Sequence, residues 1–419
     1  MVPGLSREPG AVTGCRGCGA SPLEPVLSLG RQPLANAYRR PAELDEPEAT
    51  YPLTLTLCPG CGLAQLSETL PPTELFTDYP YFSSVSDAFV EHAGDLVERV
   101  VAERDLGPGS LAVEIGSNDG YLLRQYRVRD VEVLGVDPAA NIAAVANERG
   151  IPTIAEFFGT AVAASIRSDG QLADVVHANN VIAHVPDLHD VVEGISHILK
   201  EDGIAIIETP YVRDMIERVE FDTIYHEHVF YYSLSSLSRV LEAHQLVVVD
   251  VERIPVHGGS IRVTATRASS DVDEGDSVAM LRDEEAEIGL NGPAYYREFA
   301  SNVETARHEL RDILGEFQAQ GGLVAGYGAA AKGTVLLNAF GIGAETLAFV
   351  ADRSPHKQGL YMPGVRVPIV SADELLRRRP DACLLLAWNF AEEILAQQAP
   401  YRAAGGRFIV PVPRPQLIG

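Results

Sequence analysis

The sequence predicts an α/β protein with three parts: a small N-terminal zinc module with four cysteine ligands, a doubly wound Rossmann-like domain and a second Rossmann-like domain at the C-terminus. Two CxxC pairs lie near the start of the chain. After them, apolar strand-like runs alternate with helical patterns and glycine turns, as in the βαβ units of parallel sheets. A second series of such units begins at "GGLVAGYGAAAKG" and continues to "GGRFIVPVP".

The two series suggest where the parts of the chain begin and end. We expect a zinc-binding module at residues 1–75 and a cofactor-binding α/β domain at 76–270. Residues 271–320 are acidic and rich in helical patterns, so they are predicted to form a helical connector. The C-terminal α/β domain should then occupy residues 321–419.

The composition allows this division and disfavours polyanionic partners. The chain has 419 residues, of which 46% are hydrophobic, which favours two or three domains. The net charge of -25 would repel nucleic acids and anionic membranes, although a local cluster of donors could still bind one phosphorylated small molecule. Because no signal-peptide pattern or long apolar run is present, we expect a cytoplasmic protein. The oligomeric state is not indicated, and a monomer is compatible with these features.

The CxxC pairs, Cys15/Cys18 and Cys58/Cys61, predict a closed zinc site. Each CxxC followed by glycine forms a knuckle that points two thiolates at one ion, and two knuckles supply tetrahedral coordination. The ion would be structural, since it would hold together a unit too small to fold by hydrophobic burial alone. A redox dithiol or unliganded thiols are the alternatives. Cys383 lies in an apolar run and is predicted to be a buried core residue.

The stretch "VEIGSNDGYLL" follows a predicted strand and opens a helix. Gly116 and Gly120 permit a tight turn, and the helix N-terminus offers unpaired N–H groups to a ligand. Asp137 ends the next strand and could accept hydrogen bonds from a ribose. Because the pattern differs from the pyrophosphate-binding GxGxxG, S-adenosylmethionine is the ligand that fits best. The predicted cofactor-binding residues are Glu114, Gly116, Asn118, Gly120, Asp137 and Asn179. A nicotinamide cofactor or a purely structural turn remains open.

Four ionisable side chains follow one another at Tyr225, His226, Glu227 and His228, within "FDTIYHEHVFYYS". In an extended strand the two histidines would share one face and the other two side chains the opposite face. A shared pocket therefore requires a turn or an irregular loop. Acid–base catalysis, an HxH metal pair and a structural hydrogen-bonded cluster are the possible interpretations.

Taken in order, these motifs resemble a known family. The four-cysteine module, "EIGSNDG", "NNVIAHV", "YHEHVFYYS", "HGGSIRV" and "GYGAAAKG" are similar to those of zinc-containing, S-adenosylmethionine-dependent sugar C-methyltransferases. Members of this family methylate carbon 3 of TDP-linked 4-keto-deoxysugars. The resemblance covers nearly the whole chain and implies an active site between the middle and C-terminal domains. It implies His228 as the catalytic base, while His226 inherits no role because that position varies. The other catalytic residues it implies are Tyr225, Glu227, His184 and Tyr79.

The chemistry of carbon methylation requires residues of these types. Carbon becomes nucleophilic when a proton next to a ketone is removed, and histidine is the side chain whose ordinary pKa, about 6.5, suits that task. Glu227 could orient an imidazole or hold a sugar substituent, and Tyr225 and His184 could donate to the enolate oxygen. On residue type alone, His184 could equally be a satisfied core histidine, and Tyr79 could be a packing residue.

The C-terminal series again places glycines between a strand and a helix, with Lys332 near the helix start. Helix N–H groups and the ammonium could bind a pyrophosphate, so this domain is expected to hold the nucleotide of a TDP-sugar. A domain retained only for packing is the alternative. The predicted substrate-binding residues are Asn180, His257, Ser260, Tyr327, Lys332 and Lys357.

The sequence therefore predicts methyl transfer from S-adenosylmethionine to a carbon, with C-3 expected, of a TDP-4-keto-deoxysugar. Such a reaction makes branched deoxysugars, including those of antibiotics. Methylation of another keto or hydroxyl acceptor, including O-methylation, is the alternative within enzymes. A non-catalytic protein that binds a nucleotide sugar or a cofactor is the alternative outside them.

Overall fold

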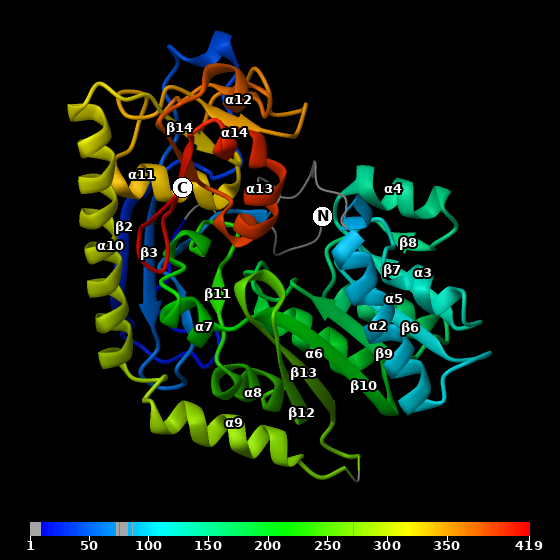
Figure 1. Cartoon of the computed structure of the whole chain (residues 1–419). Helices are drawn as coiled ribbons and strands as arrows, with labels where there is room; N and C mark the ends of the chain where they lie inside the picture. The colour runs from blue at the N-terminus through cyan, green and yellow to red at the C-terminus, as the bar shows by residue number, and fades with distance from the viewer. Residues whose placement is uncertain (1–9, 73–74, 76–82, 86, 271) are drawn as a thin grey trace.

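The computed structural model describes residues 10–72, 75, 83–85, 87–270 and 272–419 and has the α/β fold class expected from the sequence (Figure 1). Three larger sheets of four, seven and six strands organise these residues. A two-stranded sheet of β1 (Gly10–Ala11) and β5 (Glu68–Thr69) accompanies them. Within the described residues, no helix combines the length and the apolar composition needed to cross a membrane.

The four-stranded sheet belongs mostly to the cysteine-containing module. Its strand order is β11-β4-β3-β2, and all its pairs are antiparallel. The strands are β2 (Glu24–Gln32), β3 (Tyr51–Leu57), β4 (Ala64–Leu66) and β11 (Phe230–Tyr231). The edge strand β11 directly follows the YHEH stretch, with Phe230 opposite Gln65 and Tyr231 opposite Ala64. The module is therefore joined by strand pairing to the stretch that was predicted to be catalytic.

The seven-stranded sheet has the order β12-β13-β10-β9-β6-β7-β8. Its strands are β6 (Leu111–Ile115), β7 (Glu132–Val136), β8 (Thr153–Ile154), β9 (Ala173–Asn179), β10 (Leu199–Pro210), β12 (Leu246–Ile254) and β13 (Ser260–Arg267). The pairs from β8 to β10 are parallel, whereas β13 runs antiparallel between β10 and β12. The strand order reverses between β6 and β9, and ligands of open α/β sheets bind at the carboxyl ends of the strands at such a point.

Helices cover both faces of this sheet, because its strands are apolar on both faces. On β6, Ala112 packs with the apolar side chains of α2 and α3, while Val113 belongs to the core that contains α5, α6 and α8. The alternation continues along β10, where Ile206 faces the first group and Ile207 the second. The helices are α2 (Asp87–Arg104), α3 (Leu123–Arg127), α4 (Ala140–Glu148), α5 (Thr160–Ser168), α6 (Leu188–Ile198), α7 (Val212–Glu217) and α8 (Leu234–Glu242).

Two helices, α9 (Asp276–Glu287) and α10 (Pro293–Ala319), follow the middle sheet. Tyr296, Phe299 and Val303 begin a buried stripe at helical spacing along α10, and glutamates and arginines fill the opposite face. In Figure 1, α10 runs along one side of the molecule from α9 to the C-terminal domain, next to β2 and β3.

The six-stranded C-terminal sheet has the order β16-β15-β14-β17-β18-β19 and is parallel except for β19. Its strands are β14 (Val324–Tyr327), β15 (Val350–Asp352), β16 (Ile369–Ser371), β17 (Ala382–Leu385), β18 (Arg407–Val410) and β19 (Gln416–Ile418). Its helices are α11 (Ala331–Phe340), α12 (Glu374–Arg378), α13 (Ala391–Gln397) and α14 (Ala399–Ala403). The strand order reverses between β14 and β17, which defines a second potential ligand crevice.

Short 3-10 helices complete the described structure. They are η1 (Pro41–Glu43), η2 (Ser83–Val85), η3 (Phe221–Thr223), η4 (Val256–Gly258) and η5 (Trp388–Phe390). Two of them lie at informative positions: η3 immediately precedes the YHEH stretch, and η5 follows β17 at the crevice of the C-terminal sheet.

Candidate active site

The four cysteines of the CxxC pairs form one cluster, in which all sulfur atoms lie within 4.8 Å of one another. The Sγ atoms of Cys15 and Cys61 are 3.5 Å apart, as are those of Cys18 and Cys58. Tetrahedral zinc with Zn–S bonds of about 2.3 Å separates its sulfur ligands by about 3.8 Å, so these thiols fit that ion. Among the described residues, no other group of three or more potential ligands is this close, and the HxH pair forms no such site. The cluster is therefore a structural zinc site.

The glycine turn at the end of β6 has the backbone expected for a close approach to a ligand. Gly116 and Gly120 have φ angles of +64° and +79°. A Cβ at Gly116 would lie 2.5 Å from Cγ2 of Val181, so only glycine fits there. Asp137, at the end of β7, accepts hydrogen bonds from the backbone N–H of Asn118 and of Ala139, both at 2.9 Å. The acid predicted to bind ribose thus also shapes the loop.

Three buried oxygens at the carboxyl ends of β6 and β9 lack a hydrogen-bond partner among the described residues. They are Oε2 of Glu114, Oδ1 of Asn179 and Oδ1 of Asn180. Burial raises the pKa of Glu114 well above its usual value, and the charge of Asp137 adds to this shift. Buried acceptors normally have donors, so the hydroxyl and ammonium groups of a bound ligand would satisfy these oxygens. The residues fit S-adenosylmethionine at the crevice where the strand order reverses.

The YHEH stretch is a turn rather than a strand, and it divides its side chains between two directions. The hydroxyl of Tyr225 lies 2.9 Å from Nε2 of His228, and the rings of His228 and His184 meet edge to face at 4.7 Å between centroids. His226 points elsewhere, with Nε2 at 3.3 Å from the carbonyl oxygen of Pro52 in the zinc module. The turn therefore groups Tyr225, His184 and His228 and excludes His226.

The hydrogen bonds fix the tautomers of two imidazoles. Nδ1 of His228 lies 2.9 Å from the carbonyl oxygen of Thr223, and because a carbonyl only accepts, this nitrogen carries the hydrogen. Nε2 of a neutral His228 is then the basic nitrogen, and it accepts from Tyr225. Nδ1 of His184 donates likewise to the carbonyl oxygen of Glu227 at 2.7 Å. Burial lowers the pKa of His184 to about 4, so its Nε2 is an acceptor at neutral pH. The expected donation from His184 to an enolate oxygen does not fit this tautomer.

Glu227 is held by a residue that the sequence did not single out. Nδ2 of Asn36, in the zinc module, donates to Oε1 of Glu227 at 2.7 Å, across 191 residues of sequence. Burial raises the pKa of Glu227, and the hydrogen bond from Asn36 partly opposes that shift. Two residues later, the hydroxyl of Tyr38 donates to the carbonyl oxygen of Ala329 at 2.6 Å. The segment "PLANAY" therefore connects the YHEH turn with the glycine turn of the C-terminal domain. It contains no sequence motif from which this role could be predicted.

The predicted substrate-binding residues of the C-terminal domain already have protein contacts. Nζ of Lys332 lies 4.4 Å from the ring centroid of Trp388, and Nζ of Lys357 donates to the carbonyl oxygen of Ala329 at 2.7 Å. The hydroxyl of Tyr327 accepts from Nε2 of Gln398 at 3.2 Å. Helix α11, which carries Lys332 in its first turn, packs against η3, the 3-10 helix that precedes the YHEH stretch.

The remaining predicted residues are less informative. The hydroxyl of Ser260 donates to the carbonyl oxygen of Val256 at 3.0 Å and thereby closes the HGGS turn. Tyr79 and the side chain of His257 lie outside the described residues.

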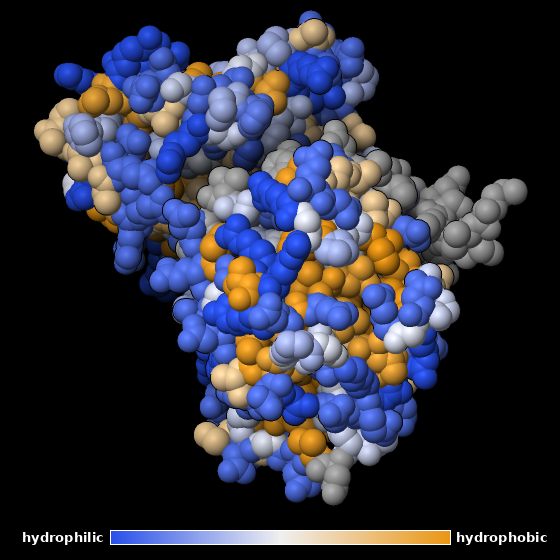
Figure 2. Space-filling model, turned by 90° about the vertical axis from the view of Figure 1, so that its right-hand side faces the viewer, coloured by the Kyte–Doolittle hydropathy of each residue, from blue (hydrophilic) through white to orange (hydrophobic). Residues whose placement is uncertain are grey.

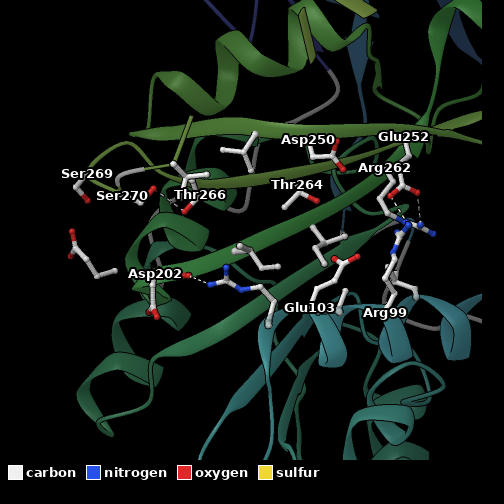
Figure 3. A pocket seen from close by; sticks show the side chains of 18 residues that line it. Arg99, Glu103, Asp202, Asp250, Glu252, Arg262, Thr264, Thr266, Ser269 and Ser270 are labelled. Atoms are coloured by element: carbon white, nitrogen blue, oxygen red, sulfur yellow. Dashed lines mark hydrogen bonds and ion pairs between the residues drawn. The ribbon is translucent and has the colours of Figure 1, made fainter. Parts of the chain in front are cut away.

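A cavity of about 470 Å³ opens elsewhere, between α2 and strands β10, β12 and β13 (Figure 3). It is lined by aliphatic residues and by paired charges, such as Arg99 with Glu252 at 2.6 Å, and by none of the predicted site residues. Figure 2 shows the side of the molecule on which α2, α3 and α4 lie, with apolar patches among polar side chains. The paired charges give this cavity no obvious ligand.

Three family models match the chain in series. They are "Putative zinc binding domain" at residues 15–76, "Methyltransferase domain" at 87–251 and "C-methyltransferase C-terminal domain" at 255–413.

A relative that matches nearly the whole chain agrees with these models. C-methyltransferase NovU of Streptomyces niveus is 40% identical over 404 residues, which cover 96% of this chain and 96% of NovU. Among solved structures, the CcbJ methyltransferase of Streptomyces caelestis is 12% identical with a TM-score of 0.33, covering 42% of this chain and 89% of its own. Magnesium protoporphyrin IX methyltransferase of Synechocystis PCC 6803 is 14% identical with a TM-score of 0.33, covering 43% and 82%. The assignment rests on the family models and NovU: the chain belongs to the zinc-containing, S-adenosylmethionine-dependent C-methyltransferases.

Proposed function

We propose that this C-methyltransferase acts on carbon 3 of a TDP-linked 4-keto-deoxysugar, with His228 as the base. The observation that carries the proposal is the tautomer of His228. Its Nδ1 is committed to the carbonyl oxygen of Thr223, so its Nε2 has the lone pair that proton abstraction requires.

The proposed proton transfer uses residues of the YHEH turn. Nε2 of His228 takes the proton from carbon 3, and the electrons of the C–H bond move to the oxygen of the C4 ketone. The imidazolium that forms is stabilised by the carbonyl oxygen of Thr223, which accepts from Nδ1. The hydroxyl of Tyr225 lies 2.9 Å from the same nitrogen, so a small rotation can direct it to the developing enolate oxygen. Glu227, buried and held by Asn36, is assigned to a hydroxyl or an amine of the sugar.

S-adenosylmethionine supplies the electrophilic methyl group. The methyl–sulfur bond of the bound cofactor would break as the enolate carbon forms the new C–C bond, and the ketone would be restored. Glu114 and Asn179 would accept from the cofactor's ammonium and polar groups, and Asp137 would accept from its ribose. His184, neutral and with Nδ1 committed, is assigned to hold the ring of His228 in place and to accept from the substrate through Nε2.

The nucleotide part of the substrate is assigned to the crevice of the C-terminal sheet between β14 and β17. Lys332 and Lys357 supply positive charge there, and the N-terminus of α11 supplies N–H groups. Asp352, at the end of β15, holds the turn by accepting from the backbone N–H of Ala329 at 2.6 Å.

One assay tests the proposal. The protein is incubated with methyl-labelled S-adenosylmethionine and a TDP-4-keto-deoxysugar, and the label is located by mass spectrometry. Without the cofactor, the wild type should exchange the hydrogen at carbon 3 with deuterated water, and His228→Asn should slow this exchange by about 10²–10⁴-fold. Label found on an oxygen would show that the enzyme O-methylates this acceptor, and it would contradict the proposed C-methylation. Undiminished exchange in His228→Asn would exclude His228 as the base.

A further inference from the structure

The short helix η3 (Phe221–Thr223) lies between the proposed base and the C-terminal domain. Thr223 accepts the Nδ1 hydrogen of His228, and this contact fixes the tautomer on which the proposed function depends. On the other side, the ring of Phe221 stacks on that of Phe340 of α11, with 4.6 Å between centroids and 19° between planes. The position of the base is thus linked to an element of the C-terminal domain through η3.

Asp222, the central residue of η3, makes a second contact with that domain. Its side chain is fully buried, and Oδ2 accepts a hydrogen bond from the indole Nε1 of Trp388 at 2.7 Å. Oδ1 has no hydrogen-bond partner among the described residues. Burial raises the pKa of Asp222 to about 6, and the charge of Lys332 and the indole hydrogen bond oppose the shift. Removal of the indole N–H would therefore leave Oδ2 of this buried carboxylate without its side-chain donor, which costs free energy.

Trp388 lies at the crevice where the nucleotide part of the substrate is proposed to bind. It opens η5, which follows the carboxyl end of β17. A Cβ at Gly328, in the turn after β14, would be only 2.6 Å from Cβ of Ala387, so the two turns of the crevice are in direct contact. The ammonium of Lys332 sits over the indole face at 4.4 Å from its centroid. One indole therefore touches the crevice through its face and η3 through its N–H group.

We infer that Trp388 and Asp222 are positioning residues for the base: their hydrogen bond holds η3 so that Thr223 keeps the Nδ1 hydrogen of His228. The inference rests on the proposed role of His228. It adds that the C-terminal domain contributes to proton abstraction as well as to substrate binding. The C-terminal domain then serves catalysis through a contact that spans 166 residues of sequence.

The test compares three variants of this pair in the full-length, zinc-loaded enzyme. Trp388→Phe removes the donor and keeps a ring in place. Asp222→Ala removes the acceptor, while Asp222→Asn keeps an acceptor oxygen for the indole N–H and removes the charge. Tyr401→Phe is the matched control, because it removes a buried hydrogen bond, from the phenol to the carbonyl oxygen of Pro380 at 2.8 Å, at the opposite end of β17. Thermal unfolding and zinc content check that each variant is folded.

The measurements are the rate of deuterium exchange at carbon 3 and the pH profile of kcat/KM. Trp388→Phe and Asp222→Ala should slow exchange at least about tenfold, as expected for loss of a hydrogen bond to a charged group. The acidic limb of their profile should move to lower pH, because a displaced Thr223 no longer stabilises the protonated base. The exchange rate of Asp222→Asn should stay within about threefold of the wild-type rate, and Tyr401→Phe should exchange at the wild-type rate. The dissociation constant of S-adenosylmethionine should be unchanged in all four.

Three outcomes would overturn the inference: wild-type exchange in Trp388→Phe, a slower rate without any shift of the pH profile, or equal losses in Asp222→Asn and Asp222→Ala. The outcome for His228→Asn separates this inference from the proposed function. If that variant loses exchange while Trp388→Phe keeps it, only the positioning role fails. If His228→Asn itself exchanges normally, the proposed function fails first.

Discussion

The hydroxyl of Tyr225 and Nε2 of His228 are joined by a 2.9 Å hydrogen bond within a single turn of the chain, and the two rings lie 4.1 Å apart between centroids. The carbonyl oxygen of Thr223 occupies the other nitrogen of the imidazole. A phenol and an imidazole of defined tautomer therefore face the same small region, an arrangement that suits the proposed formation of an enolate.

Replacing Tyr225 by phenylalanine should lower kcat by about 10²-fold, because the enolate oxygen loses its proposed hydrogen-bond donor. Deuterium exchange at carbon 3 and methyl transfer should fall together, since both pass through the enolate. The control is Tyr296→Phe, which removes a buried phenol hydroxyl from α10 without touching the turn. A Tyr225→Phe variant as fast as the wild type would show that the phenol is not the donor.

Asn36 should matter for the binding of the sugar more than for the cofactor. Asn36→Ala leaves the buried carboxylate of Glu227 without its 2.7 Å donor, so the side chain loses its fixed orientation. We expect KM for the nucleotide sugar to rise about tenfold, the usual consequence of losing a hydrogen bond to a charged group. The dissociation constant of S-adenosylmethionine, measured by calorimetry, should not change. Equal losses of sugar and cofactor affinity would point instead to general misfolding of the zinc module.

Loss of zinc should reduce activity as well as stability. Cys58→Ser should lower the zinc content of the purified protein, measured by atomic emission, and lower Tm by several degrees, because structural zinc contributes directly to folding. Activity should also fall, since β11 pairs with β4 and the guanidinium of Arg239 donates to the carbonyl oxygen of Gly60 at 2.5 Å. Cys383→Ser, a buried thiol outside the cluster, should retain zinc.

Stability should depend on pH through Glu220. Burial raises the pKa of this carboxyl to about 8, with a smaller opposing contribution from Lys332. Between about pH 4.5 and pH 8 the folded state keeps a proton that the unfolded state releases, so the free energy of unfolding falls as the pH rises. Glu220→Gln has no carboxyl to titrate, so its free energy of unfolding should not show this decrease with rising pH. Its Tm should therefore exceed that of the wild type by more at pH 8 than at pH 5.

Neutralising any carboxylate reduces the overall negative charge, so Glu98→Gln on the surface of α2 is the control for Glu220→Gln. Its effect on Tm should be similar at the two pH values, because Glu98 is 77% exposed. If the two variants change Tm in the same way, the burial of Glu220 has no role in the pH dependence.

Lys332→Ala separates binding of the nucleotide from chemistry. Removing the ammonium should raise KM for the nucleotide sugar about 10–100-fold, the range for a charged hydrogen bond, and leave the affinity for S-adenosylmethionine unchanged. Steady-state kinetics with the sugar varied at saturating cofactor would measure this. An unchanged KM would remove Lys332 from the proposed diphosphate site and leave it as a packing partner of Trp388.

Local signals in the sequence were enough to predict the zinc ligands and the glycine turn. Two CxxC knuckles are such a signal, because their thiols can reach one ion only if the knuckles meet. The turn at Gly116 is another, since a Cβ there would collide with Val181. The spacing to Asp137 follows from the length of one βα unit. These features depend on residues that are close in the chain or on the regular length of a βα unit.

Only the tertiary structure decided which distant residues contact the candidate active site. Asn36 reaches Glu227, and Trp388 reaches Asp222, across 191 and 166 residues, and neither pair has a sequence pattern of its own. The same holds for β11, a two-residue strand whose partner lies in the zinc module. The donor role expected for His184 does not fit the neutral tautomer, because its Nδ1 hydrogen is donated to a backbone carbonyl. Residue types and local spacing predict which groups can react, whereas packing between domains decides their partners, their tautomers and hence their roles.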